Sequence, residues 1–268
     1  MTASFPRLVA TDLDGTIVRS DGTISPRTLA ALSRIEQAGA QLVFVTGRPP
    51  RVMGDIAAVF SHQGVALCSN GALIYDMHAD RIIGEHLIPP LELAEAARRL
   101  RDAIPEIGLA VESAHGLTGD GRYEAGAWDD DVSIRRLPDA ELFSRPAAKL
   151  LGRHPWLSAD ELLALASPAV AGVVTVYHSN GPRLVEASAA GVSKASALAS
   201  LAAEQGIPPT AVVAFGDMPN DLPMLAWAGT SYAVANAHPD VLAAADHVIA
   251  SNDEDGVAQV IDRLFAPF

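Results

Sequence analysis

The stretch Asp12-Leu13-Asp14-Gly15-Thr16 decides how the chain is interpreted. It follows the apolar run Leu8-Val9-Ala10, which predicts a buried strand that ends just before the first carboxylate. Ligands of open parallel sheets bind outside the carboxyl ends of the strands. Two carboxylates this close disfavour joint ionisation unless a cation lies between them. The pattern indicates a divalent metal, an Asp that attacks and an Asp that transfers protons; the alternative is an ordinary strand end with an Asp-Gly turn.

The composition predicts a globular chain with an acidic surface. The 268 residues suit one large domain or a core with an insert, and 49% of them are hydrophobic. A net charge of −13 argues against nucleic acid or an anionic membrane as the main partner. We see no apolar run near the roughly 18 residues of a membrane span and no secretory signal pattern. With a lone Cys68, which cannot form an internal disulfide, we expect a cytoplasmic enzyme, monomeric or a small homo-oligomer.

Alternating strand and helix patterns predict a doubly wound, mostly parallel, Rossmann-like α/β sheet in the two outer parts of the chain. Strands are expected at Leu8–Thr11, Leu42–Val45, Val65–Cys68, Ala211–Phe215, Tyr232–Val234 and His247–Ile249. Helices are expected from Ser25-Pro26 to Gly39, over roughly Pro50–Phe60, at Ser193–Gln205 and near Asp255–Phe265. A small hairpin is expected over Val18–Ile24, with Asp21-Gly22 at its turn.

The middle of the chain has a different texture. Its strand patterns are shorter and alternate more, which is typical of an antiparallel sheet with one solvated face. Strands are expected at Leu109–Glu112, Ala147–Leu151, Val173–His178 and Arg183–Glu186, and helices at Leu91–Ala103 and Ala159–Ala166. We therefore predict a catalytic core made of residues 1–84 and 188–268, interrupted by an inserted α+β cap domain at 85–187.

Three more polar stretches follow predicted strand ends or begin predicted helices. Thr46-Gly47-Arg48 offers a hydroxyl, an open amide and a helix start, which together suit an anion. Lys194 lies beside the helix cap Ser193, and Gly216-Asp217-Met218-Pro219-Asn220-Asp221 offers oxygen atoms for a hard cation. Each stretch alone also fits a Gly turn, a solvated Lys or a charged helix start. Together at the same edge of a sheet, they favour a binding site.

The four stretches resemble, in order, the four motifs of the haloacid dehalogenase (HAD) superfamily. Ser69-Asn70-Gly71-Ala72, Ala235-Asn236-Ala237-His238-Pro239 and the run from Ser251 to Val257 resemble its Cof-type, subfamily IIB, phosphatase branch. The resemblance covers both predicted core segments, and the insert matches in position and length. Met218-Pro219 departs from many relatives, which puts a supporting polar role at position 218 in doubt.

The resemblance implies Mg²⁺-dependent hydrolysis of small phosphate monoesters, such as sugar phosphates, through an aspartyl-phosphate. Asp12 is implied as the nucleophile and Asp14 as the general acid and base. Mg²⁺ is implied on the carboxylates of Asp12 and Asp217 and on the backbone carbonyl of Asp14. Asp221 is implied to hold a metal-bound water or to orient Lys194.

The resemblance also implies how the phosphate binds. Thr46, the amide of Gly47, Lys194 and Asn220 are implied to bind the phosphoryl oxygens, and Arg48 to contact the substrate. The implied partner is a small phosphorylated metabolite rather than a nucleic acid or a membrane. The insert would set specificity, so the sequence does not name the substrate.

Two other functions stay open at this point. A phosphosugar mutase of the same superfamily also uses an Asp nucleophile and a cap of this kind. A non-catalytic sensory module that binds Mg²⁺ and phosphate would keep the acidic pocket without turnover. Asp14 argues against the module, because a pocket without turnover needs no acid or base two residues after the nucleophile.

Overall fold

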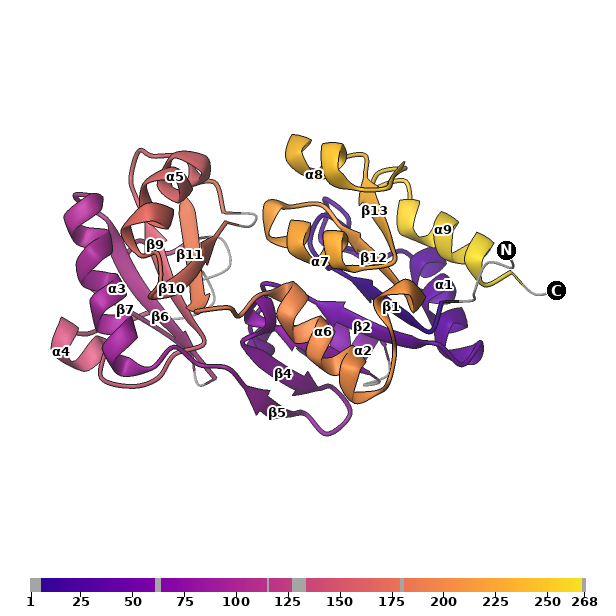
Figure 1. Ribbon diagram of the computed structural model, residues 1–268, viewed down its shortest axis with the longest axis horizontal. Coiled ribbons are helices and arrows are strands. Elements are labelled where there is room, and N and C mark those ends of the chain that lie inside the picture. The colour runs from indigo at the N-terminus through magenta and orange to yellow at the C-terminus, as the bar shows by residue number, and fades with distance from the viewer. Residues whose placement is uncertain (1–5, 61–63, 115, 127–133, 179–180, 267–268) are drawn as a thin grey trace.

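The computed structural model describes residues 6–60, 64–114, 116–126, 134–178 and 181–266. Within these residues, eight strands form one sheet and six form a second, and Figure 1 shows two bodies side by side along the long axis. Each sheet carries its own cluster of buried apolar side chains. No helix in the described part of the chain is long and apolar enough to cross a membrane.

The first sheet is built from both outer parts of the chain. Its strands run in the order β14-β13-β12-β1-β2-β3-β4-β5. Neighbours are parallel from β14 to β3, and β4 and β5 extend the edge in antiparallel pairing. The strands are β1 (Leu8–Thr11), β2 (Gln41–Val45), β3 (Val65–Cys68), β4 (Leu73–Asp76), β5 (Arg81–Glu85), β12 (Val212–Gly216), β13 (Thr230–Val234) and β14 (His247–Ile249). The predicted mostly parallel α/β sheet is confirmed.

Helices cover this sheet, and α1 packs against α9 and α6 against α7. They are α1 (Pro26–Gln37), α2 (Gly54–Val59), α6 (Lys194–Glu204), α7 (Leu222–Trp227), α8 (Pro239–Ala244) and α9 (Gly256–Leu264). Ser25 begins α1 as expected, because its hydroxyl accepts the Thr28 amide and Pro26 occupies the first turn.

One local prediction was confirmed in part, and another was wrong. The helix expected over Pro50–Phe60 divides into a 3-10 turn, Pro50–Val52, and α2, which begins at Gly54, a residue that weakens helix interiors. The hairpin expected over Val18–Ile24 is a compact turn without paired strands. There the Asp21 carboxylate accepts the Thr23 amide and hydroxyl, and such local bonds compete with strand pairing.

The second sheet comes from the middle of the chain, in the order β10-β11-β9-β6-β7-β8. Its pairs are antiparallel, as expected, except for β7 with β8. Its elements are α3 (Pro90–Ala103), β6 (Gly108–Ser113), β7 (Gly116–Gly119), β8 (Arg135–Arg136), α4 (Asp139–Leu142), β9 (Lys149–Arg153), α5 (Ala159–Ala169), β10 (Val174–Tyr177) and β11 (Leu184–Ala189). β5 and β11 each run across a predicted boundary, and the division into 1–84, 85–187 and 188–268 stays a prediction.

The two faces of the second sheet differ. One face packs on α3 and α5 through the larger apolar cluster. The other face carries a small cluster that includes Tyr123, Leu151 and Leu184, and these three side chains line a cavity shared with the first sheet. The face expected to be solvated is therefore a wall of that cavity.

Candidate active site

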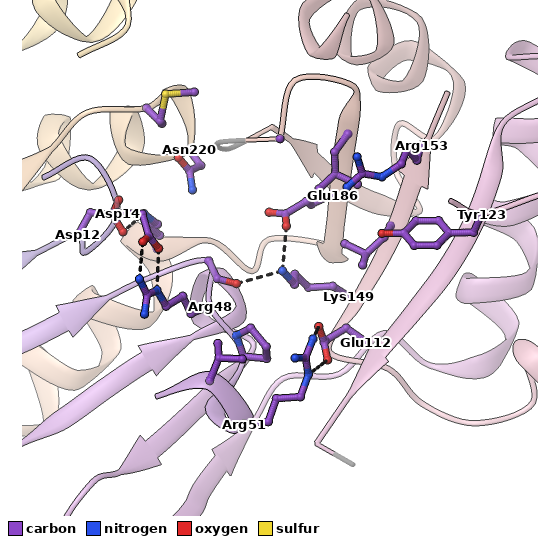
Figure 2. A pocket seen from close by; sticks show the side chains of 18 residues that line it. Asp12, Asp14, Arg48, Arg51, Glu112, Tyr123, Lys149, Arg153, Glu186 and Asn220 are labelled. Atoms are coloured by element: carbon purple, nitrogen blue, oxygen red, sulfur yellow. Dashed lines mark hydrogen bonds and ion pairs between the residues drawn. The ribbon is translucent and has the colours of Figure 1, made fainter. Parts of the chain in front are cut away.

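A cavity of about 130 Å³ lies between the carboxyl edge of the first sheet and the second sheet. The first sheet and its loops and helices contribute Asp12, Asp14, Gly47, Arg48, Lys194 and Asn220. The second sheet contributes Glu112, Tyr123, Lys149, Leu151, Arg153 and Glu186. Figure 2 shows Asp12, Asp14 and Arg48 facing Lys149 and Glu186 across this space.

Three carboxylates meet where β1 and β12 end. β1 and β12 are parallel neighbours, so Asp12 and Asp217, which follow them directly, lie side by side. The Asp12 amide continues the pairing by donating to the Phe215 carbonyl at 3.1 Å. Asp12, Asp217 and Asp221 each offer a carboxylate oxygen, and these oxygens lie within 4.8 Å of one another. All three residues are buried.

Gly15 makes room for this cluster. Its φ of +77° lies in the region that glycine adopts without strain. A Cβ at this position would lie 2.2 Å from Asp217 Oδ2, so the Asp217 carboxylate would have to move. Gly in the first motif is thus required twice, by the turn and by the close approach of Asp217.

Lys194 neutralises part of the acidic cluster. Its ammonium donates to Asp12 Oδ1 at 2.8 Å and to Asp221 Oδ1 at 2.6 Å. It begins α6, where Ser193 and Ser196 form a reciprocal cap that fixes the start of the helix. Burial by itself lowers the pKa of Lys194, but the charges of Asp12 and Asp221 raise it overall. The side chain is therefore a fixed positive charge beside Asp12.

The remaining charge balance favours a cation. Burial raises the pKa of Asp12 to about 7, with repulsion from Asp221 and Asp14 added and attraction to Lys194 opposing it. Burial and the charges of Asp12 and Asp221 also raise the pKa of Asp217 well above its usual range. Buried carboxylates held together are stabilised when a cation joins them.

The hydrogen bonds indicate which oxygens a cation would meet. Both oxygens of Asp221 are engaged, Oδ1 by Lys194 and Oδ2 by the amides of Asp217 and Met218. Asp217 Oδ1 accepts the Thr16 hydroxyl at 3.1 Å. Within the described residues, no hydrogen bond reaches Asp12 Oδ2 or Asp217 Oδ2. Hard oxygen ligands of this kind fit Mg²⁺, so the residues present suit the implied metal.

Asp14 lies apart from the three clustered carboxylates. Both of its oxygens accept hydrogen bonds from Arg48, Oδ2 from Nε at 2.8 Å and Oδ1 from Nη2 at 2.5 Å. This two-point contact fixes the plane of the carboxyl group. Arg48 thus contacts the residue implied as acid and base.

The loop of residues 46–48, called here the 46–48 loop, follows β2 beside β1. The Thr46 hydroxyl accepts the Arg48 amide at 3.1 Å, and Thr46 is fully buried. The turn Ser69–Gly71 after β3 holds this loop: Ser69 donates its amide to the Arg48 carbonyl, and Asn70 donates its amide to the Thr46 carbonyl, both at 2.9 Å.

Most residues singled out from the sequence converge here, though not all of them face the cavity. Thr46, Asp217 and Asp221 are not among its lining residues; each contacts the lining or its supporting turn. Asn220 lines the cavity and donates to Asn70 Oδ1 at 2.9 Å, while its own Oδ1 is buried and has no partner in the described part of the chain. Met218 lines the cavity with an apolar side chain, as its departure from the motif suggests.

Sequence analysis missed the opposite wall. Lys149 and Glu186 form a buried ion pair at 2.8 Å, and Glu112 pairs with Arg51 from the first sheet's side at 3.1 Å. One signal was present: charged side chains are seldom buried, yet Glu112 and Glu186 stand inside mostly apolar stretches, and Lys149 directly precedes the apolar pair Leu150-Leu151. Asn70, quoted for the family resemblance without a role, joins the two walls through Glu186 at 3.0 Å.

Comparisons with known proteins agree with this geometry. The family model of haloacid dehalogenase-like hydrolases matches residues 9–261. The chain is 28% identical over 282 residues to pyridoxal phosphate phosphatase YbhA of Escherichia coli, covering 95% of this chain and 97% of that protein. It is 26% identical over 291 residues to 5-amino-6-(5-phospho-D-ribitylamino)uracil phosphatase YitU of Bacillus subtilis, covering 97% and 98%.

A solved structure supports the same assignment. A haloacid dehalogenase-like hydrolase from B. subtilis superposes with a TM-score of 0.83 at 25% identity, covering 96% of this chain and 99% of that one. The match extends across both sheets. With four motifs in order and their side chains gathered at one sheet edge, the chain belongs to the haloacid dehalogenase-like hydrolases.

Proposed function

We propose that this protein is a phosphatase that hydrolyses phosphate monoesters of small metabolites, with Asp12 as nucleophile and Mg²⁺ as cofactor. One observation carries the proposal: the buried Asp12 carboxylate faces the cavity, with Lys194 on one oxygen and Asp217 close by. The two relatives described above are named as phosphatases of small phosphorylated metabolites, which supports the same substrate class.

In this proposal, Asp12 and Asp14 divide the chemistry. An Asp12 oxygen bonds to phosphorus while the ester oxygen leaves with a proton from Asp14. Asp14 then takes a proton from water, which attacks phosphorus and releases inorganic phosphate from Asp12. Arg48 orients Asp14 through both of its oxygens, and Lys194 orients Asp12.

The metal would be held by the carboxylates of Asp12 and Asp217, joined by the backbone carbonyl of Asp14. When bound, Mg²⁺ would offset negative charge on the carboxylates and on the transferring phosphoryl group. Asp221 is proposed not to bind the metal directly, because both of its oxygens already bind Lys194 and backbone amides.

The phosphoryl oxygens are proposed to bind four donors. These are the Lys194 ammonium, the Gly47 amide, the Thr46 hydroxyl and the second N–H of the Asn220 side chain. The hydrogen bonds of the Ser69–Gly71 turn hold the 46–48 loop before substrate arrives. Phosphoryl transfer depends mainly on such positioning and charge stabilisation.

The test measures phosphate release from sugar phosphates, pyridoxal phosphate and other phosphorylated metabolites, with Mg²⁺ or with EDTA. Wild type is compared with Asp12→Asn, and with Asp262→Asn, which changes one carboxylate in an ion pair on α9. We expect release that requires Mg²⁺ and is lost in Asp12→Asn alone. Equal activity of Asp12→Asn and wild type would contradict the proposal. A ³¹P spectrum that shows a rearranged phosphate ester without free phosphate would favour a mutase.

A further inference from the structure

The 46–48 loop receives hydrogen bonds on its three carbonyls from two separate parts of the molecule. The Thr46 and Arg48 carbonyls accept amides of Asn70 and Ser69, which belong to the first sheet's own turn. The Gly47 carbonyl between them accepts the ammonium of Lys149 at 3.0 Å, and Lys149 lies on β9 of the second sheet. One carbonyl of the loop therefore depends on the opposite wall, as Figure 2 shows.

Lys149 is held in place by a buried partner. Its ammonium also donates to Glu186 Oε1 at 2.8 Å, and the two side chains are 4% and 6% exposed. Taking two charges out of water costs several kcal/mol per ion unless geometry and further hydrogen bonds compensate. Glu186 Oε2 supplies such a bond by accepting the Asn70 side-chain amide at 3.0 Å. Because both charges are buried and hydrogen-bonded, the Lys149 and Glu186 side chains have defined positions.

These contacts form a continuous chain between the walls. It runs from the Gly47 carbonyl to Lys149, then to Glu186, and returns to the first sheet at Asn70. Asn70 in turn accepts the Asn220 side-chain amide at 2.9 Å. The two residues at the ends of this series of hydrogen bonds are Gly47 and Asn220, and the proposed function assigns phosphate binding to both. The second sheet thus contacts the phosphate site through two cooperating side chains.

The bond to Gly47 fixes more than one group. Its carbonyl shares a planar peptide unit with the Arg48 amide, so orienting one orients the other. That amide donates to the Thr46 hydroxyl at 3.1 Å, and the Arg48 side chain holds Asp14. Through Arg48, Lys149 therefore acts indirectly on the Thr46 hydroxyl, a proposed phosphate donor, and on Asp14, the proposed acid and base.

We propose that Lys149 is a positioning residue that sets the 46–48 loop for phosphate binding when the second sheet lies against the first. Glu186, itself bound by Asn70, holds the Lys149 ammonium in position. This inference rests on the proposed function, because it assumes that the 46–48 loop binds phosphate. Donors fixed before the reaction stabilise developing charge without reorganising, so the affinity for phosphate should depend on the contact between Lys149 and Gly47.

The experiment measures the affinity of inorganic phosphate by calorimetry in the presence of Mg²⁺. The main variant is Lys149→Met combined with Glu186→Gln, which removes both charges and leaves no unpaired buried carboxylate. Arg51→Met combined with Glu112→Gln is the matched control, because it removes both charges of another ion pair between the walls, again leaves no unpaired buried carboxylate, and does not touch Gly47. Glu186→Gln alone is a milder second variant that keeps the size of the side chain and its contact with Asn70.

We expect the double variant to bind inorganic phosphate about tenfold more weakly or worse, the size of losing a charged hydrogen bond. KM should rise by the same factor for p-nitrophenyl phosphate and for a hydrolysed metabolite, since the loop contacts the group they share. Glu186→Gln should show the same direction with a smaller change. The control with both Arg51→Met and Glu112→Gln should change phosphate affinity by less than about twofold, because that pair does not hydrogen-bond to the Gly47 carbonyl.

Unchanged phosphate affinity with losses confined to one substrate would overturn the inference, and would make Lys149 a contact of the leaving group. Equal losses in the control with Arg51→Met and Glu112→Gln would also overturn it, because any contact between the walls would then have the same effect. If wild type binds phosphate and hydrolyses nothing, the proposed function fails, while the comparison of affinities still decides the role of Lys149.

Discussion

The two walls of the cavity place their side chains in different ways. On the first sheet, short stretches that follow neighbouring strands each deliver several groups, as Asp12 with Asp14 and Asp217 with Asp221 do. On the second sheet, single residues on separate strands converge, namely Glu112, Lys149 and Glu186. The first wall is built from strand ends, so the backbone positions its chemistry. The second is built from strand faces, so its side chains come together only through the pairing of the strands and through hydrogen bonds between them.

The largest effect expected on the first wall comes from removing the metal. Asp12 and Asp217 have raised pKa values because burial and neighbouring carboxylates oppose their ionisation. Dialysis against EDTA should abolish hydrolysis, and Mg²⁺ should restore it and also raise the Tm. Ca²⁺ should substitute poorly, because its larger and looser shell does not keep octahedral geometry. Full activity after exhaustive dialysis would show that the first wall works without a cation.

Asp12→Asn should come next in size. The change keeps the shape of the side chain and removes the attacking charge, so kcat should fall by about 10³-fold or more. The protein should still fold, since one repulsive buried charge is relieved. Steady-state kinetics and thermal unfolding together check this. Turnover within about tenfold of wild type would rule out Asp12 as the nucleophile.

Gly15→Ala tests whether strand ends alone place the first wall. The new Cβ would meet Asp217 Oδ2 at 2.2 Å, so Asp217 must move. A displacement near 1 Å can cost about 10²-fold in rate, and we expect a loss of that order with weaker Mg²⁺ binding. Gly22→Ala is the control, because Gly22 also has positive φ, +81°, but nothing lies within 4 Å of the added Cβ. Equal kinetic losses in both variants would remove the argument from close approach.

The smallest expected effect concerns the second wall and the size of the substrate. If the second sheet restricts access to the cavity, small phosphate esters should enter it and folded proteins should not, and the net charge of −13 should disfavour polyanions. We expect kcat/KM for the best metabolite to exceed that for phosphopeptides or oligonucleotides by about tenfold or more. A panel assay measures this ratio. An advantage for phosphoproteins would show that the second sheet does not restrict access.

The contrast between the walls also explains what could be predicted. The parallel sheet and the residues of the first wall were accessible because local apolar runs end in polar motifs, and β1 and β12 then pair side by side. The family resemblance added order and roles to Asp12, Thr46, Lys194 and Asp217. These roles stay predictions until they are measured.

The second wall was not accessible in the same way. Lys149 and Glu186 are far apart in the sequence and meet because β9 and β11 pair antiparallel, a register that no local pattern sets. The bond from Lys149 to Gly47 depends further on how two separate sheets meet. The division of the helix near Pro50 and the turn at Asp21 were missed for a simpler, local reason. α2 begins only at Gly54, and the Asp21 carboxylate accepts the Thr23 amide where strand pairing was predicted.

Detection of a phosphoryl group on Asp12 tests the central claim most directly. In Asp14→Asn, p-nitrophenyl phosphate should still transfer its phosphoryl group, because its leaving group departs without a proton. The intermediate should then persist, since the base that activates water is gone. We predict a burst of nitrophenol close to the enzyme concentration, and phosphorylation confined to Asp12 in the acid-quenched protein by peptide mass spectrometry. A quenched protein without phosphate on Asp12, while wild type turns over normally, would contradict the account.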